Sequence, residues 1–103
     1  MMTESYNKLK YEFDSKLWQY PGKGGWCFVL LPNEIAKEIR DNLKSEEEGW
    51  GRLKVIAKIG TAEWKTSIWF DTKMDTYLLP IKAEIRKKEL LQVDSIFPIC
   101  IWI

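Results

Sequence analysis

The feature that most constrains this chain is a period-two alternation of apolar and polar residues, which occurs in three separate segments. In residues 8–18 an apolar or small side chain stands at every second position, with charged residues between them. Residues 52–59 and 64–70 repeat the pattern. Successive side chains of a β-strand point to opposite faces of a sheet, so each segment predicts a strand that buries one face. We therefore expect a mainly β fold.

Turn residues predict how these strands are connected. A glycine-rich turn at residues 21–25 separates the first strand from a continuous apolar run at residues 26–31. We expect these two segments to form a hairpin, with the apolar run buried on both sides. A tight connection at residues 60–63 joins the next two strands into a second hairpin. A short extended piece at residues 77–79 ends at Pro80.

Two short helices and a terminal strand complete the predicted elements. Residues 34–43 carry isoleucine or leucine at spacings of four, which predicts an amphipathic helix with Asn33 as its N-cap. Residues 81–90 have the pattern of a second short helix. Residues 95–103 are apolar on both faces, which is typical of a strand, and Pro98 within it indicates a sheet edge or a bulge.

A weak internal repeat relates the two helices to the strands before them. Each copy contains a tryptophan, a Leu-Pro pair and a Glu-Ile-Arg triplet: Trp26, Leu31-Pro32 and Glu38-Ile39-Arg40, then Trp64, Leu79-Pro80 and Glu84-Ile85-Arg86. The repeat indicates a barrel with pseudo-two-fold symmetry. Because both tryptophans begin predicted strands, we expect both in the core.

The composition narrows the classes of function. The 103 residues form one domain, 1–103, in which residues 1–7 are expected to be a flexible N-terminal segment. The chain has no histidine and only two cysteines, so we expect no metal site, no cofactor and no catalytic group of a common type. A net charge of +1 argues against nucleic acid as the partner.

The two cysteines and the N-terminus bear on where the protein works. Cys27 and Cys100 each lie in an apolar stretch, so we expect both to be buried, unpaired and slow to react. The first ten residues are polar and contain no apolar stretch of the kind found in a signal peptide. The apolar runs are too short to cross a bilayer. We expect a cytoplasmic protein with no membrane partner.

Several motifs in order resemble one known family. They are GWGRLKV at 49–55, IGT at 59–61, WKTSI at 64–68, YLLPIK at 77–82 and IRK at 85–87. Residues 8–103 thereby resemble a small prokaryotic domain of unknown function that is sometimes fused to a bacteriocin-protection (YdeI/OmpD-associated) segment. The resemblance implies a double-split β-barrel of six to seven strands with two short helices capping its ends.

That barrel class also contains the AbrB/MazE-type transition regulators, which form it from two chains. The chain departs from the family at two places. Tyr77 stands where the family usually has histidine, and Val93-Asp94 stands where it usually has Gly-Asp. The family brings no established activity to carry over, so the resemblance leaves the function open.

Aromatic side chains on polar faces are the main candidates for a binding site. Trp18 and Trp69 alternate with charged and polar neighbours, while Trp102 lies with Ile96 and Cys100 on the second apolar face of the last strand. Either the capping helices cover these rings, or a ligand or a second subunit does. We predict that a subunit or a ligand covers at least one of Trp69 and Trp102.

Three hypotheses for function remain open at this point. The first is a non-enzymatic binding or protein-interaction module that associates with itself or binds a small ligand. The second is a nucleic-acid-binding regulator, by analogy with AbrB-type barrels and from the basic second helix. The third is an enzyme of unknown type. The acidic loop at residues 45–49 is expected to be solvated. The binding residues favoured by the sequence are Trp18, Arg52, Lys65, Trp69, Tyr77, Lys82, Arg86 and Trp102.

Overall fold

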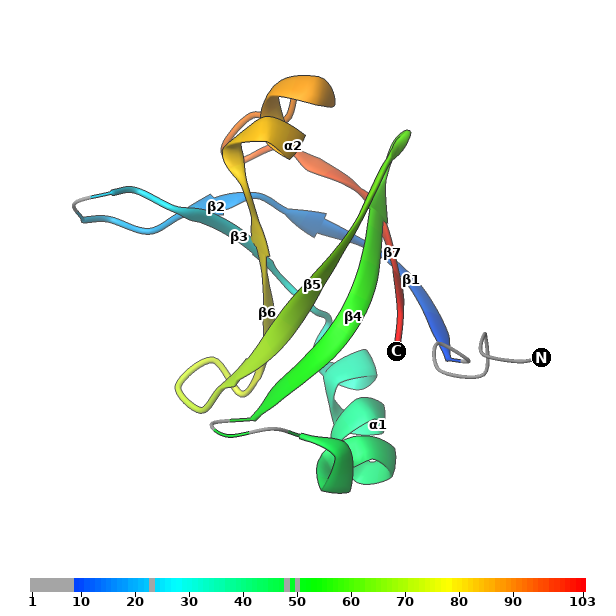
Figure 1. Ribbon diagram of the computed structural model, residues 1–103. Helices are drawn as coiled ribbons and strands as arrows, with labels where there is room; N and C mark the ends of the chain where they lie inside the picture. Colours follow the sequence, from blue (N-terminus) through cyan, green and yellow to red (C-terminus); the bar gives the residue numbers. More distant parts are fainter. Residues whose placement is uncertain (1–8, 23, 48, 50) are drawn as a thin grey trace.

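A seven-stranded antiparallel sheet and two short helices make up the protein (Figure 1). The structure is a computed structural model that describes residues 9–22, 24–47, 49 and 51–103. In chain order the elements are β1 (Lys10–Lys16), β2 (Trp18–Gln19), β3 (Cys27–Leu30), α1 (Asn33–Leu43), the 3₁₀ turn η2 (Lys44–Glu46), β4 (Arg52–Ile59), β5 (Ala62–Asp71), β6 (Thr76–Ile81), α2 (Ala83–Lys88) and β7 (Ile96–Trp102). The mainly β fold with two short helices is confirmed. The expectation for residues 1–7 lies outside the described residues.

The sheet curls into a half-barrel whose two edge strands are neighbours in the chain. The strand order is β1-β7-β4-β5-β6-β3-β2, so the sheet begins with β1 and ends with β2. Only Leu17 separates these two strands, and its side chain is fully buried. The hydroxyl of Ser15 donates to the carbonyl of Leu30 over 2.7 Å, which draws β1 towards β3 across the opening.

This arrangement corrects the predicted hairpin between residues 8–18 and 26–31. Within the first predicted strand, only the β2 part pairs with β3, through Trp18 opposite Phe28, whereas β1 pairs along its whole length with β7. The chain changes partner at Leu17, whose N–H donates to the carbonyl of Ser95 over 3.0 Å and whose carbonyl accepts the N–H of Asp94 over 2.8 Å. Alternation continues through such a joint, and therefore the pattern alone did not reveal it.

The sheet is only partly paired at two places. β7 meets β4 at three positions, from Ile56 opposite Trp102 to Lys58 opposite Cys100. β5 and β6 likewise pair at three positions, residues 69–71 with 76–78. The N–H of Leu9 donates to the carbonyl of Ile103, and the N–H of Ile103 donates to the carbonyl of Leu9. Backbone hydrogen bonds point alternately to the two sides of a strand, so the even-numbered residues of β7 direct theirs towards β4. β7 is not an edge strand, because it lies between β1 and β4, but Pro98 lies beyond the three positions where β7 pairs with β4, so its missing N–H breaks no pairing there.

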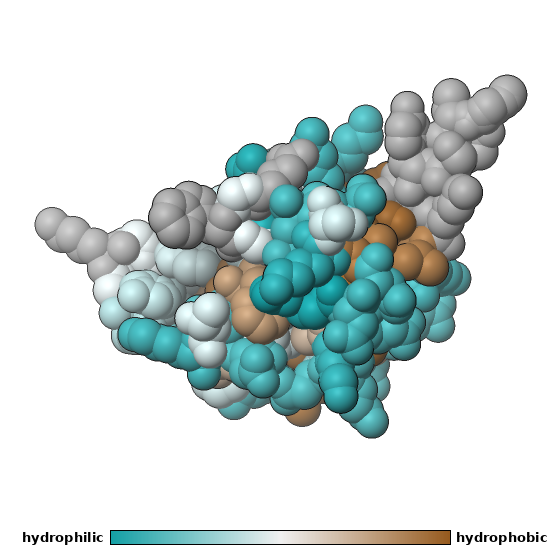
Figure 2. Space-filling view, turned by 90° about the horizontal axis from the view of Figure 1, so that it is seen from below, coloured by the Kyte–Doolittle hydropathy of each residue, from teal (hydrophilic) through white to brown (hydrophobic). Residues whose placement is uncertain are grey.

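The core fills the concave side of the half-barrel, and the helices lie at its two ends (Figure 1). Ala36 and Ile39 bury the inner stripe of α1, with Ile39 fully covered. Seen from the end that α1 covers, the surface is largely hydrophilic, with smaller hydrophobic areas between the hydrophilic ones (Figure 2). Tyr11, Phe13 and the inward residues of β4 complete the same core.

Three local predictions are wrong. Pro32, and not Asn33, occupies the N-cap of α1, and the Asn33 amide instead donates to the carbonyl of Asp75 over 3.1 Å. Ile81 is buried as predicted, but it is the last residue of β6 and not the first of the second helix, which begins at Ala83. Trp26 is 42% exposed and lies outside the core, since it precedes β3 on the outer face. Trp64 is half-buried and packs against the core as expected.

Among the described residues, no helix is both long and apolar enough to cross a membrane.

Candidate binding surface

Four aromatic side chains share the outer face of the β2–β3 hairpin. Trp18 lies opposite Phe28, and the N–H of Tyr20 donates to the carbonyl of Trp26 over 2.9 Å. Between these pairs, Gln19 lies opposite Cys27, whose side chain points to the core. Because faces alternate along a strand, all four rings lie on one side. The Tyr20 and Trp26 rings stack at 5.8 Å, and the Trp26 and Phe28 rings lie 5.0 Å apart.

The same face continues from the hairpin onto the body of the sheet. Phe28 lies opposite Pro80 of β6, and Leu30 lies opposite Leu78. Leu78 in turn lies opposite Trp69 of β5, so the apolar row crosses three strands. We call this set the aromatic surface; its members are Trp18, Tyr20, Trp26, Phe28, Leu30, Trp69, Leu78 and Pro80. Of these, Trp18, Tyr20, Trp26 and Trp69 are 39%, 52%, 42% and 36% exposed.

Charges of both signs border the aromatic surface. The Lys16 ammonium lies 4.1 Å from the centre of the Trp18 ring and 3.6 Å from a carboxylate oxygen of Asp94. Lys82 pairs with Glu84 at 3.4 Å, directly after Ile81, which lies opposite Cys27. The Arg52 guanidinium lies 5.4 Å from the Trp69 ring. Such cation–ring contacts hold the lysine and arginine stems along the rings and keep the rings in place.

The comparison with known families bears on the same region. The sequence model of a family described as a domain of unknown function, DUF1905, matches residues 13–98. The chain belongs to this family. The matched part of the DUF1905 domain contains every residue of the aromatic surface and leaves Trp102 outside. A comparison with curated proteins found no match.

The DUF1905 fold brings together only some of the residues favoured by the sequence. Trp18 and Trp69 belong to the aromatic surface, and Arg52 and Lys82 lie at its border. Trp102 lies on the outer face of β7, half-buried, with the Lys10 ammonium 5.7 Å from its ring. It lies opposite Ile56 of β4, which lies opposite Lys65 of β5. Lys65 and Trp102 therefore occupy a different part of the outer face.

Tyr77 faces the core and Arg86 bonds to the backbone of β6, so both make structural contacts. Tyr77 is fully buried and donates its hydroxyl to a carboxylate oxygen of Glu47. The Arg40 guanidinium lies 3.7 Å from the same carboxylate and 3.9 Å from the centre of the Phe70 ring. Burial and the hydrogen bond to Glu47 raise the pKa of Tyr77 well above its ordinary value. Arg86 donates from Nε to the carbonyl of Ile81 over 3.2 Å.

Glu47 corrects the prediction of a solvated acidic loop. Its side chain is only 10% exposed, because it turns back from the end of η2 to meet Tyr77 and Arg40. No local pattern marks this residue, since its neighbours Glu46 and Ser45 are exposed as predicted. Tyr20, Trp26 and Phe28 were also missed as site residues. Trp18 and Tyr20 before the turn, and Trp26 and Phe28 after it, stand at every second position. This spacing predicts that the four rings share one face if the two segments pair.

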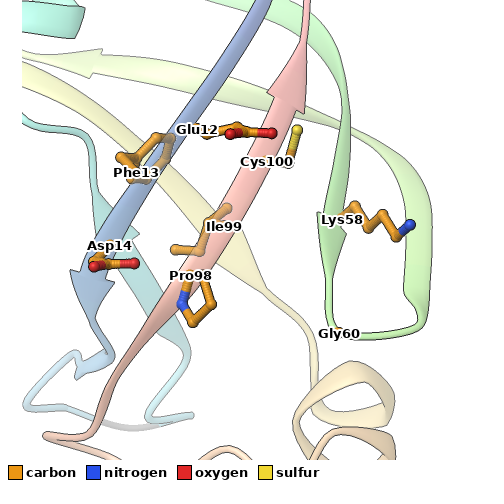
Figure 3. Close-up of a pocket in the computed structure, with 8 residues that line it drawn as sticks. All are labelled: Glu12, Phe13, Asp14, Lys58, Gly60, Pro98, Ile99 and Cys100. Atoms are coloured by element: carbon orange, nitrogen blue, oxygen red, sulfur yellow. The ribbon is translucent and has the colours of Figure 1, made fainter.

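A shallow pocket of about 600 Å³ opens where β7 separates from β4 (Figure 3). It is lined by Glu12, Phe13, Asp14, Lys58, Gly60, Pro98, Ile99 and Cys100. Figure 3 shows the Glu12 carboxylate directed towards the Cys100 thiol. Cys100 is therefore half-buried at a pocket and not in the core as predicted, whereas Cys27 is buried and both thiols are free.

The pocket offers little chemical reactivity. Burial raises the pKa of the Cys100 thiol, which keeps it in the protonated, weakly nucleophilic form at neutral pH. Within the described part of the chain, no group of three or more cysteine, aspartate or glutamate side chains is arranged to hold a metal ion.

Proposed function

We propose that this DUF1905 domain is a non-enzymatic interaction module that binds a protein partner through the aromatic surface. One observation carries the proposal. Four rings, each more than a third exposed, lie on one continuous face: Trp18, Tyr20, Trp26 and Trp69. At ~150–250 Å² for each aromatic residue, the exposed fractions correspond to about 350 Å² of surface in water. A patch of roughly 300–600 Å² is the largest found on a typical monomer and is often functional.

The charges at the border favour a protein over a nucleic acid. Lys16 is paired with Asp94, and Lys82 is paired with Glu84. A nucleic-acid site carries an excess of lysine and arginine that neutralises phosphates. Protein interfaces instead combine an aromatic centre with a polar rim of both signs. The net charge of +1 supports the same choice.

Two groups with raised pKa values, Tyr77 and Cys100, support a non-enzymatic role. A general base or nucleophile works with a pKa near the operating pH. The pKa values of Tyr77 and Cys100 are both raised, which moves each group away from its reactive ionised form. These two groups therefore suit a structural role better than acid–base or nucleophilic catalysis.

We assign the half-barrel to the double-split class from the way its strands pair. The short pairings of β4 with β7 and of β5 with β6 divide the curled sheet twice, which supports the double-split assignment.

We place the protein in the cytoplasm, because the free thiols of Cys27 and Cys100 suit a reducing compartment.

Site-specific photo-cross-linking tests the proposed function. Tyr20 is replaced by the photo-reactive residue benzoylphenylalanine in cells that express the chain, and Leu90 is replaced in a matched control. Leu90 is 84% exposed and lies outside the aromatic surface. We expect a defined protein adduct from position 20 and none from position 90. The absence of an adduct at position 20, or equal adducts at both positions, would contradict the proposal.

A further inference from the structure

We infer that the partner of the aromatic surface is a second copy of this chain, docked about a two-fold axis so that the two aromatic surfaces cover each other. The inference rests on the proposed function and names its partner. It starts from the β2–β3 hairpin, which projects from the body of the half-barrel (Figure 1). β2 has two residues and pairs with β3 alone, so the hairpin has little support from its own chain beyond β6.

The exposed rings of the hairpin make a self-complementary contact. The hairpin continues the sheet through β6, and its inner face, with Cys27 and Val29, is buried in the core, whereas its outer face carries the exposed rings. Trp18, Tyr20 and Trp26 remain 39–52% exposed in the single chain, so its own fold leaves this face incompletely covered. In a two-fold dimer the same patch lies on both sides of the interface, and flat aromatic rings pack well on one another.

The available area matches the requirement for a specific but reversible dimer. The four more exposed rings and the four half-buried members together offer about 500 Å² of apolar surface per copy. The pair would bury about 1,000 Å² before the border residues are included, which reaches the lower limit for a specific interface. Buried area alone does not set an affinity. Complexes at this low end of interface size are typically weak and transient, so we expect a dissociation constant on the order of 1–100 µM.

The mixed charges at the border also fit a second copy. The side chains of Lys16 and Asp94 and those of Lys82 and Glu84 form two ion pairs at the rim. A border of one sign would repel its own copy, whereas a border of both signs lets cations of one copy meet carboxylates of the other. The net charge of +1 leaves only weak repulsion between two whole chains.

Sedimentation equilibrium on the purified full chain, from about 1 to about 500 µM, tests the inference. We expect the mass to rise from one chain to two across this range. Trp26→Lys places a charge at the centre of the aromatic surface and should weaken the dimer at least ~10-fold. Leu90→Lys makes the same kind of change on an exposed apolar residue elsewhere and should leave the dimer unchanged. Circular dichroism checks that both variants are folded, and the comparison uses only folded protein.

The indole N–H signals in nuclear magnetic resonance spectra provide a second, site-resolved measurement. Trp18, Trp26 and Trp69 should shift with protein concentration, and Trp102 on the β7 part of the sheet should not. A chain that stays monomeric up to 500 µM overturns the inference, as does a dimer that survives Trp26→Lys. If that monomer still cross-links another protein through position 20, the proposed function stands and only the identity of the partner is wrong.

Discussion

The hydroxyl groups of Tyr11 and Tyr77 both donate to carboxylates on or next to α1. Tyr11 reaches Glu38 over 3.0 Å, and Tyr77 reaches Glu47. Each bond ties a strand of the sheet to the end of the half-barrel that α1 covers. Burial, with the bond to Glu38, raises the pKa of Tyr11 to about 12, and burial raises the pKa of Tyr77 further. At the residue scale, the neutral form of each tyrosine is therefore the form that stabilises the fold.

Alkaline pH should destabilise the protein through these two tyrosines. Their pKa is higher in the folded chain than in the unfolded chain, where it is about 10. Their stabilising contribution is therefore complete below about pH 10 and is lost as pH rises through the folded values. The urea midpoint, measured from pH 9 to pH 12, should fall more steeply in the wild type than in the Tyr11→Phe/Tyr77→Phe variant. Equal slopes would show that other groups cause the loss.

The two cysteines should differ in reactivity. Cys27 is almost completely buried, whereas Cys100 is half-buried, with a raised pKa, at the pocket between β7 and β4. With a thiol reagent at pH 8, Cys100 should react slowly and Cys27 should react only after unfolding. Mass spectrometry of labelled peptides over time measures both rates. Faster labelling of Cys27 than of Cys100 in the native protein would contradict the placement of β3 against the core.

The joint between β1 and β2 is the main feature at the scale of elements. One buried residue, Leu17, connects the two edge strands of the half-barrel, and its backbone is bonded to the segment that leads into β7. Because β5 and β6 pair at their ends, Trp69 lies opposite Leu78, and the aromatic surface continues from β6 onto β5. The hairpin, the joint and β6 together determine where the aromatic surface lies.

Leu17→Ala should destabilise the protein by about 2–5 kcal/mol, because it removes buried methyl groups and leaves a cavity at a fully buried position. Leu9→Ala, at an exposed position just before β1, should change the free energy of unfolding by less than about 0.5 kcal/mol. Urea denaturation followed by tryptophan fluorescence measures both. A cost for Leu17→Ala as small as that of the control would mean that the joint does not hold the edges together.

At the scale of the whole molecule, charge balance and aromatic exposure point in the same direction. The chain carries 16 basic and 15 acidic residues, so its field attracts phosphate only weakly. Its notable surface property is instead the concentration of exposed rings on one part of the outer face. Association should therefore depend on apolar contact and change little with salt.

A gel-shift assay tests this expectation for nucleic acid. At ~50 mM salt, single- or double-stranded DNA should show little retention below about 1 µM protein, because few phosphates would be neutralised. A basic protein of similar size serves as the positive control. Tight binding that weakens steeply with added salt would favour the nucleic-acid hypothesis over the interaction module.

Much of the half-barrel follows from local patterns that the sequence carries by itself. Alternation in residues 52–59 and 64–70 predicted β4 and β5 and the faces of their side chains, because period two is a property of a single strand. The spacing of isoleucines predicted α1 for the same reason. Trp18 and Trp69 were placed correctly on an outer face.

Only the tertiary structure decided which strands pair and which side chains meet. Strand pairing depends on contacts between distant segments, so the change of partner at Leu17 left no local trace. The contact of Glu47 with Tyr77 joins residues 30 positions apart, and it leaves a carboxylate that the sequence suggested was solvated only 10% exposed. The aromatic surface arises the same way: its rings come from β2, β3, the segment that joins them, and β5, and only the register through β6 makes them one face.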